Sequence, residues 1–110
     1  MQIEERTVGD VVVLDLKGKI TLGEGDELLK DKVNSLVNQG HKKIVLNLAD
    51  VPYIDSAGLA ALIQAMQKVE GDGGKFMLAG LQETVRSIFE ISRLDQVFQI
   101  FPDAEAALVG

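Results

Sequence analysis

Residues 44–59 read IVLNLADVPYIDSAGL, and the main features of the fold follow from this segment. It opens with the nearly continuous apolar run 44–48, which is typical of a strand buried on both faces of a sheet. From Leu59 onward, apolar residues return at helical spacing, and Asp55 or Ser56 is positioned to cap that helix. The stretch therefore predicts a central strand, a short loop and a helix.

The flanking sequence adds further strands and helices around this unit. An alternating run before Gly9-Asp10 and a β-branched run after it predict an N-terminal hairpin. Apolar spacing predicts helices over 26–39, 57–70 and 82–91, strands over 76–79 and 97–101, and a short tail helix capped by Asp103. Alternating strands and helices after a hairpin indicate an α/β fold, with a four- to five-stranded mixed sheet and about four helices packed on it.

The chain of 110 residues is the size of one compact domain, and we assign residues 1–110 to a single unit. Its composition, 46% hydrophobic and 25% charged, is that of a globular rather than a disordered protein. A net charge of −6 disfavours binding to nucleic acid or to anionic membranes. The lack of cysteine excludes disulfides and thiolate chemistry, and no signal or membrane-spanning segment is recognised. We expect a soluble, cytoplasmic protein.

Two glycine-containing segments have simpler explanations than phosphate binding. Gly18-Lys19 lacks both the Ser or Thr that should follow the lysine and the glycine expected five residues earlier. The glycine-rich run 71–74 follows a helix, whose C-terminal dipole repels phosphate. Both segments favour ordinary turns, and nucleotide hydrolysis is not expected.

The candidate catalytic side chains are also better explained by structural roles. His41, the only histidine, precedes the central strand whereas Ser56 follows it, so a Ser-His couple is excluded. Asp50 and Asp55 flank one loop, but no third acid lies nearby in the sequence to complete a Mg²⁺ site, and capping and turn chemistry account for both. We expect no catalytic residue, no metal site, no cofactor and no enzymatic activity.

The junction at residues 53–59 is the strongest candidate for a functional site. It joins the carboxyl end of the buried strand to a helix N-terminus, where open α/β sheets usually place their ligands. Gly58 has two interpretations, because a glycine that costs ~1 kcal/mol relative to alanine in a helix either allows close packing or gives a partner access to the backbone. Tyr53 likewise either packs under the loop or contacts a partner.

The apolar strand followed by DSAGL at residues 55–59 resembles the signature of the STAS domains found in bacterial anti-sigma factor antagonists. The resemblance extends over essentially the whole chain, including the N-terminal hairpin and Gly18, and it implies a STAS-like single domain. In that family the serine after the aspartate is phosphorylated by an anti-sigma factor that is also a serine kinase, and a partner phosphatase removes the phosphate. By this match Ser56 is the phosphoacceptor, and Ala57 leaves it as the only hydroxyl of the motif.

The resemblance thus predicts a binding module that, when unphosphorylated, binds the anti-sigma factor and releases a sigma factor. We expect the partner-binding surface to contain Tyr53, Asp55, Ser56, Ala57 and Gly58, and a side chain added at Gly58 to hinder both binding and phosphorylation. Many relatives are acidic just after the glycine matching Gly18, whereas this chain has Lys19-Ile20-Thr21, which leaves the kinase undetermined. A constitutive STAS scaffold and a ligand- or nucleotide-sensing module remain as alternatives, and the oligomeric state stays open.

Overall fold

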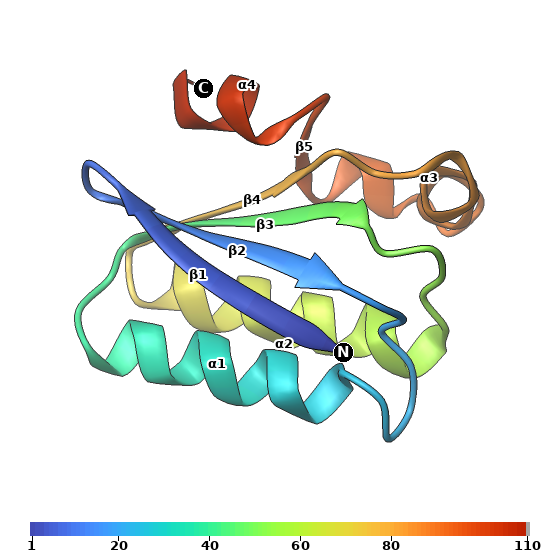
Figure 1. Ribbon diagram of the computed structural model, residues 1–110, viewed down its shortest axis with the longest axis horizontal. Helices are drawn as coiled ribbons and strands as arrows, with labels where there is room; N and C mark the ends of the chain where they lie inside the picture. The colour runs from blue at the N-terminus through green and yellow to red at the C-terminus, as the bar shows by residue number, and fades with distance from the viewer. Residues whose placement is uncertain (110) are drawn as a thin grey trace.

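The computed structural model describes residues 1–109 and is shown in Figure 1. Its elements, in chain order, are β1 (Gln2–Val8), β2 (Val11–Lys17), α1 (Asp26–Asn38), β3 (Lys43–Asp50), α2 (Ser56–Gly71), β4 (Lys75–Ala79), α3 (Glu83–Ile91), the 3-10 helix η1 (Leu94–Gln96), β5 (Gln99–Phe101) and α4 (Ala104–Val109). This succession confirms the predicted α/β organisation with an N-terminal hairpin.

The strands form one mixed sheet in the order β1-β2-β3-β4-β5. β1 is antiparallel to β2, and every other neighbouring pair is parallel. The expected run 44–48 lies in β3, the middle strand, where Leu46 pairs with Leu14 on one side and Leu78 on the other. Because parallel strands end at the same edge of a sheet, the loops that follow β2 and β3 emerge side by side.

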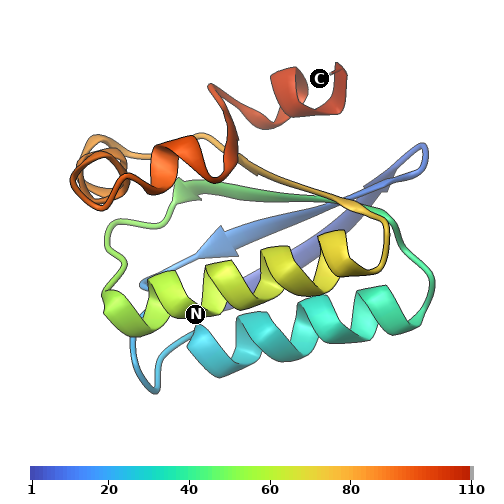
Figure 2. The ribbon, with the colours of Figure 1, turned by 180° about the vertical axis from the view of Figure 1, so that it is seen from behind.

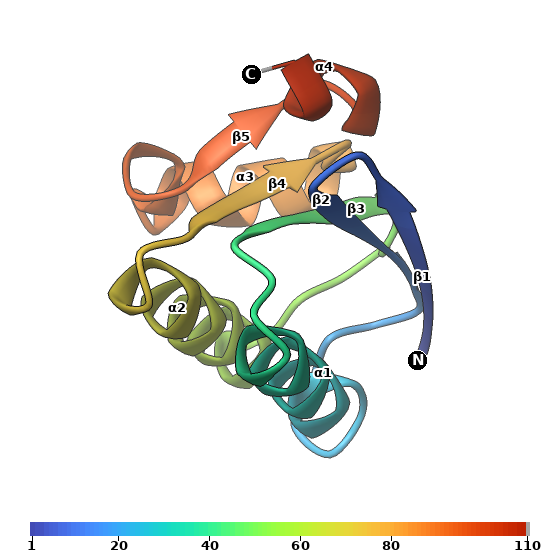
Figure 3. The same cartoon turned by 90° about the vertical axis from the view of Figure 1, so that its left-hand side faces the viewer.

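The helices are divided unequally between the two faces of the sheet. Figure 3 shows α1 and α2 end-on beneath one face and α4 above the other. α3 is seen along its axis in Figure 1 and from the side in Figure 3, so it runs across α1 and α2. In Figure 2, α1 and α2 lie parallel and both begin at the end where β3 stops. Within residues 1–109, no helix has the length and apolar character that a bilayer crossing requires.

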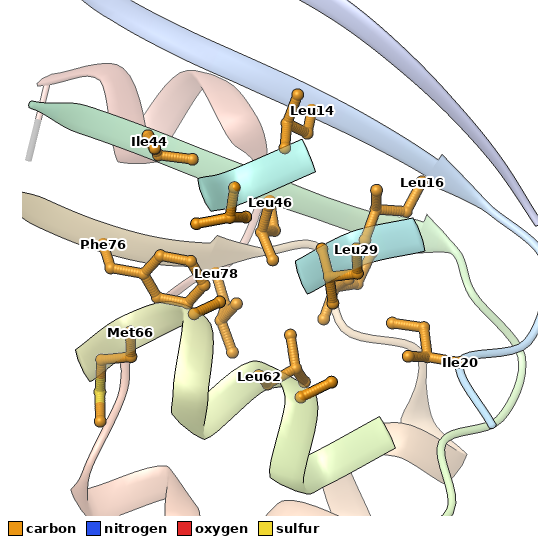
Figure 4. Close-up of a cluster of buried hydrophobic side chains, with 14 of the residues drawn as sticks. Leu14, Leu16, Ile20, Leu29, Ile44, Leu46, Leu62, Met66, Phe76 and Leu78 are labelled. Atoms are coloured by element: carbon orange, nitrogen blue, oxygen red, sulfur yellow. The ribbon is translucent and has the colours of Figure 1, made fainter. Parts of the chain in front are cut away.

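β3 is buried on both faces, as its continuous apolar run predicts. Leu46 lies in the main core and is completely buried. Figure 4 shows Leu46 and Leu78 extending from the sheet toward Leu62 of α2. On the opposite face, Val45 belongs to a smaller cluster that the short α4 covers with Ala104 and Ala107. Burial on both faces is consistent with the position of β3 as the central strand of the sheet.

The three predicted longer helices and the strand predicted over 76–79 differ from the structure by one residue at one or both ends, and the last strand differs by two. The last strand was expected from residue 97, but β5 begins at Gln99, because the backbone N–H groups of Val97 and Phe98 both donate to the carbonyl of Leu94, each over 3.0 Å. α2 begins at Ser56, one residue earlier than expected. The predicted cap of the tail helix is confirmed, since Asp103 accepts the N–H of Ala106 over 2.8 Å.

Replacing Leu46 with alanine tests the central position of β3. Because Leu46 is fully buried, Leu46→Ala should lower the free energy of unfolding by about 2–5 kcal/mol, measured by urea denaturation. Leu28→Ala is the matched control, because Leu28 is 48% exposed and its loss should change stability by only about 0.5 kcal/mol. Equal losses in the two variants would contradict the central burial of β3.

Candidate functional site

The loop after β2 and the loop after β3 are held together by backbone hydrogen bonds. The N–H of Gly18 donates to the carbonyl of Asp50 over 3.1 Å, and the N–H of Ile20 donates to the carbonyl of Tyr53 over 3.2 Å. The N–H of Asp55 returns a bond to the carbonyl of Ile20 over 3.3 Å. Residues 18–20 therefore run as a short extension of the sheet directly beside the predicted functional junction.

Asp55 is the N-cap of α2 and also the link between the two loops. Its Oδ1 accepts the N–H of Gly58 over 2.8 Å, which is the expected geometry of an N-cap. Its Oδ2 accepts the N–H of Leu22 over 3.1 Å, a bond that spans 33 positions of the chain. These bonds, first that to Gly58 and then that to Leu22, hold the pKa of the Asp55 carboxyl below its ordinary value. The predicted capping role of Asp55 is therefore confirmed.

Ser56 is the first residue of α2, and its side chain is exposed. Asp55 supplies the cap, and the Ser56 hydroxyl makes no hydrogen bond with any residue in the range 1–109. His41 lies before β3 and Ser56 lies beyond its end, so the expected separation of this pair is confirmed. Within the described residues no side chain is hydrogen-bonded to this hydroxyl, which is open to an incoming group.

Gly58 is required by close packing, which was one of its two interpretations. It is buried, and a Cβ at this position would lie 2.0 Å from the carbonyl oxygen of Ile20 and 2.7 Å from Cγ2 of Ile54. The group that packs against Gly58 is therefore the backbone of Ile20, in the loop after β2. A larger residue here would distort the backbone of the site. Weaker binding and phosphorylation in such a variant would therefore follow from this distortion as well as from blocked access.

The remaining predicted site residues lie together around Ser56. Tyr53 is 45% exposed rather than packed under its loop, while Ala57 is half-buried at the start of α2. Leu22, which was not predicted to belong to the site, is 78% exposed and joins this group through its bond to Asp55. The available signal was an apolar residue followed by a glycine in a segment without helical or strand periodicity.

Leu22 and Gly23 form the tip of a tight turn. The N–H of Thr21 donates to the carbonyl of Glu24 over 2.7 Å, and the N–H of Glu24 donates back to the carbonyl of Thr21 over 2.9 Å. Gly23 has a φ of 77°, a conformation that favours glycine. Its N–H donates over 3.0 Å to Oδ1 of Asp26, which begins α1 and is 5% exposed. Both N–H groups at the tip are therefore held by carboxylates.

The surroundings of Ser56 are acidic. The segments 18–27 and 50–60 together contain one basic residue, Lys19, and five acidic residues, Glu24, Asp26, Glu27, Asp50 and Asp55. The N-termini of α1 and α2 point to the same end of the molecule, as Figure 2 shows, and their dipoles partly offset this charge. A partner that covers the site should present basic groups at its rim.

A hollow elsewhere on the surface is a weaker candidate for ligand binding. It has a volume of about 510 Å³ and is lined in part by Arg6, Asn47, Gly80 and Glu105. Arg6 and Asn47 are already bonded to the carboxylate of Asp15, each over 2.8 Å. Their polar groups are therefore engaged within the protein, and the exposed junction around Ser56 is the better-supported site.

Comparison with known proteins identifies the family of this chain. The family model described as STAS domain matches residues 2–107. The chain belongs to the STAS domain family. It is 30% identical over 103 residues to a Thermotoga neapolitana protein whose name places it among anti-sigma factor antagonists, covering 94% of this chain and 91% of that one.

Solved structures extend this comparison. This STAS domain superposes with a TM-score of 0.90 and 29% identity on a crystal structure from Thermotoga maritima named for the same class, covering 97% of this chain and 92% of that one. It also shares the fold of Bacillus SpoIIAA in its phosphorylated form, with a TM-score of 0.75 and 23% identity, covering 98% of this chain and 97% of that one. The STAS fold expected from the motif is confirmed.

Gly58→Ala tests the close approach of Ile20 to α2. The added Cβ would meet a backbone carbonyl, so the free energy of unfolding should fall by about 1–3 kcal/mol or more. The matched control is Gly71→Ala in the last turn of the same helix, where a Cβ meets nothing within 4 Å and stability should rise or stay unchanged, by up to about 1 kcal/mol. Urea denaturation measures both, and a Gly58→Ala variant as stable as Gly71→Ala would contradict the packing.

The lowered pKa of Asp55 predicts how the junction responds to acid. Because the folded pKa lies below the unfolded value, the carboxylate stabilises the fold above about pH 4, and this contribution is lost as the pH falls through the lowered pKa. In NMR titrations, the amide signals of Leu22 and Gly58 should move together with a midpoint below about pH 3.9, and Asp55→Asn should abolish this shared transition. A higher midpoint, or movement of one amide alone, would contradict the paired bonds.

Proposed function

We propose that this STAS domain is an anti-sigma factor antagonist that acts as a cytoplasmic binding module and is switched by phosphorylation of Ser56. Unphosphorylated, it binds an anti-sigma factor that is also a serine kinase and thereby releases a sigma factor. A serine phosphatase restores this state. The domain itself performs no catalysis, because its kinase and phosphatase supply the chemistry.

The exposed hydroxyl of Ser56 at the start of α2 is the observation that carries this proposal. A serine at a helix start usually serves as the cap, but Asp55 fills that role here. The hydroxyl can therefore change its chemical state without breaking a bond that holds the fold. Its position beside a loop on the same surface makes it accessible to a kinase active site.

The phosphoryl transfer needs groups that only the kinase provides. The Ser56 oxygen forms a bond to the γ-phosphorus of ATP, the bond from that phosphorus to the bridging oxygen of ADP breaks, and ADP leaves. The hydroxyl proton passes to a base of the kinase, since no side chain in residues 1–109 accepts a hydrogen bond from the Ser56 hydroxyl and both Asp55 oxygens already accept backbone N–H groups. Ser56 thus acts as substrate.

The same geometry accounts for a switch that alters binding more than folding. Phosphate adds about −1.5 to −2 charges at a helix N-terminus, where the dipole and free N–H groups favour an anion. In a covered interface, however, that dianion must be desolvated beside the Asp55 carboxylate, which costs several kcal/mol, or at least about a thousandfold in affinity. Phosphorylation should therefore exclude the partner while the domain stays folded.

The comparisons support this proposal at the level of the family. The Thermotoga relatives bear names of the anti-sigma factor antagonist class, and SpoIIAA, which has the same fold, exists in a phosphorylated form. The motif DSAGL at residues 55–59 carries the match onto this chain, with Ser56 as its single hydroxyl.

Incubation with an anti-sigma factor kinase of the same organism and ATP is the test. Intact-mass analysis should detect one added phosphate in the unsubstituted chain and none in Ser56→Ala, because the acceptor oxygen is absent. Ser35→Ala and Ser87→Ala are matched controls on exposed helical serines and should still accept one phosphate.

Two results would contradict the proposal. Phosphate retained by Ser56→Ala would place the acceptor elsewhere, and a chain that binds the anti-sigma factor equally well with and without phosphate would be a constitutive scaffold. Thermal melts complete the experiment, since Ser56→Asp should shift Tm by only a few degrees. Loss of cooperative unfolding in Ser56→Asp would instead give the hydroxyl a structural role.

A further inference from the structure

Leu22 is the most exposed apolar side chain at the junction, and the turn that carries it is unusually well fixed. The side chain is 78% exposed, while the N–H groups of Leu22 and Gly23 are held by the carboxylates of Asp55 and Asp26. The two bonds between Thr21 and Glu24 close the turn behind the tip. An apolar side chain is thus presented to solvent from a backbone whose amides are already satisfied.

Such an arrangement suits binding better than it suits folding. An exposed leucine contributes little to the hydrophobic core, whereas a loop fixed before association loses less conformational freedom when a partner binds. The bonds that fix the loop come from the first residue of α1 and from the cap of α2. The same two helix starts therefore support the loop and flank Ser56.

The charges around Leu22 indicate the chemistry of the partner. Glu24 closes the turn, Asp50 is bonded to Gly18, and Asp55 is bonded to Leu22. Lys19 is the single basic residue in these segments. Tyr53, 45% exposed on the adjoining loop, adds apolar area next to this rim. A complementary surface would contain an apolar pocket surrounded by Lys or Arg.

We propose that Leu22 is the principal apolar contact by which this domain binds its anti-sigma factor, and that the Asp55 carboxylate links the Leu22 turn to the state of Ser56. The inference rests on the proposed function. In the unphosphorylated chain, Asp55 holds the turn so that Leu22 enters an apolar pocket of the partner, with basic groups of the partner around it.

Phosphate on Ser56 acts on this link through charge and through competition for N–H groups. A dianion on the residue next to Asp55 repels the Asp55 carboxylate and competes with its Oδ1 for the N–H of Gly58, so that the carboxylate is displaced. Either effect weakens the bond from the Leu22 N–H to Oδ2 of Asp55, which measures 3.1 Å in the unmodified chain. The Leu22 turn then loses its fixed position as the charge on Ser56 excludes the partner.

The first test measures affinity for the anti-sigma factor kinase used in the phosphorylation assay. By calorimetry, Leu22→Ser should weaken binding by about tenfold or more, as expected for a central apolar contact. Leu28→Ser is the matched control: it removes another exposed leucine from the adjacent helix and should keep the affinity within about twofold. Both variants should melt cooperatively.

The outcomes separate this inference from the proposed function. If the unsubstituted chain binds and Leu22→Ser binds equally well, the Leu22 contact is wrong while the proposed function stands. Equal losses in Leu22→Ser and Leu28→Ser would also overturn the contact. If the unsubstituted chain does not bind at all, the proposed function fails and the contact fails with it.

The second test needs no partner and examines the Asp55 link. The full chain is made with phosphoserine incorporated at position 56, and amide hydrogen exchange is followed by NMR. The Leu22 amide should exchange roughly fivefold faster or more than in the unmodified chain, as expected for the loss of about one hydrogen bond. The Thr21 and Glu24 amides, which bond to each other's carbonyls, serve as internal references. Unchanged exchange at Leu22 would overturn the link.

Discussion

The carbonyl of Ile20 lies directly against the first turn of α2, and the geometry of the functional junction depends on this close approach. A Cβ at position 58 would lie 2.0 Å from that oxygen, so only a glycine lets the two backbones meet. Ile20 also exchanges hydrogen bonds with Tyr53 and Asp55. A loop from one part of the chain is thereby fixed beside a helix start formed about thirty-five residues later, a distance that sequence periodicity does not convey.

This contact allows a division of roles between neighbouring residues. Asp55 satisfies the N–H of Gly58 and, with its second oxygen, the N–H of Leu22. Ser56 is thereby released from capping and keeps an exposed hydroxyl. A regulatory modification is best tolerated at a group that carries no structural bond, because the altered charge then acts mainly on a partner.

The charges at the junction affect folding and association differently. Five acids and one base lie in the two segments that build it, and two helix dipoles point toward it. The surface can attract a basic partner, while the dipoles limit the cost of one more anion to the isolated domain. In the proposed switch, the same phosphate is nearly neutral for folding and strongly unfavourable for association.

The fold class, the central strand and the position of Ser56 at a helix start could all be predicted from the amino-acid sequence. These features depend on local periodicity, on buried apolar runs and on a short motif, all of which are visible along the chain. The folded chain was needed to show that close packing requires glycine at position 58, that Tyr53 is partly exposed, and that Leu22 lies at the site. Those outcomes depend on which backbone atoms of a distant loop reach the helix start, and that is settled by the parallel pairing of β2 with β3, which places the ends of both strands at one edge of the sheet.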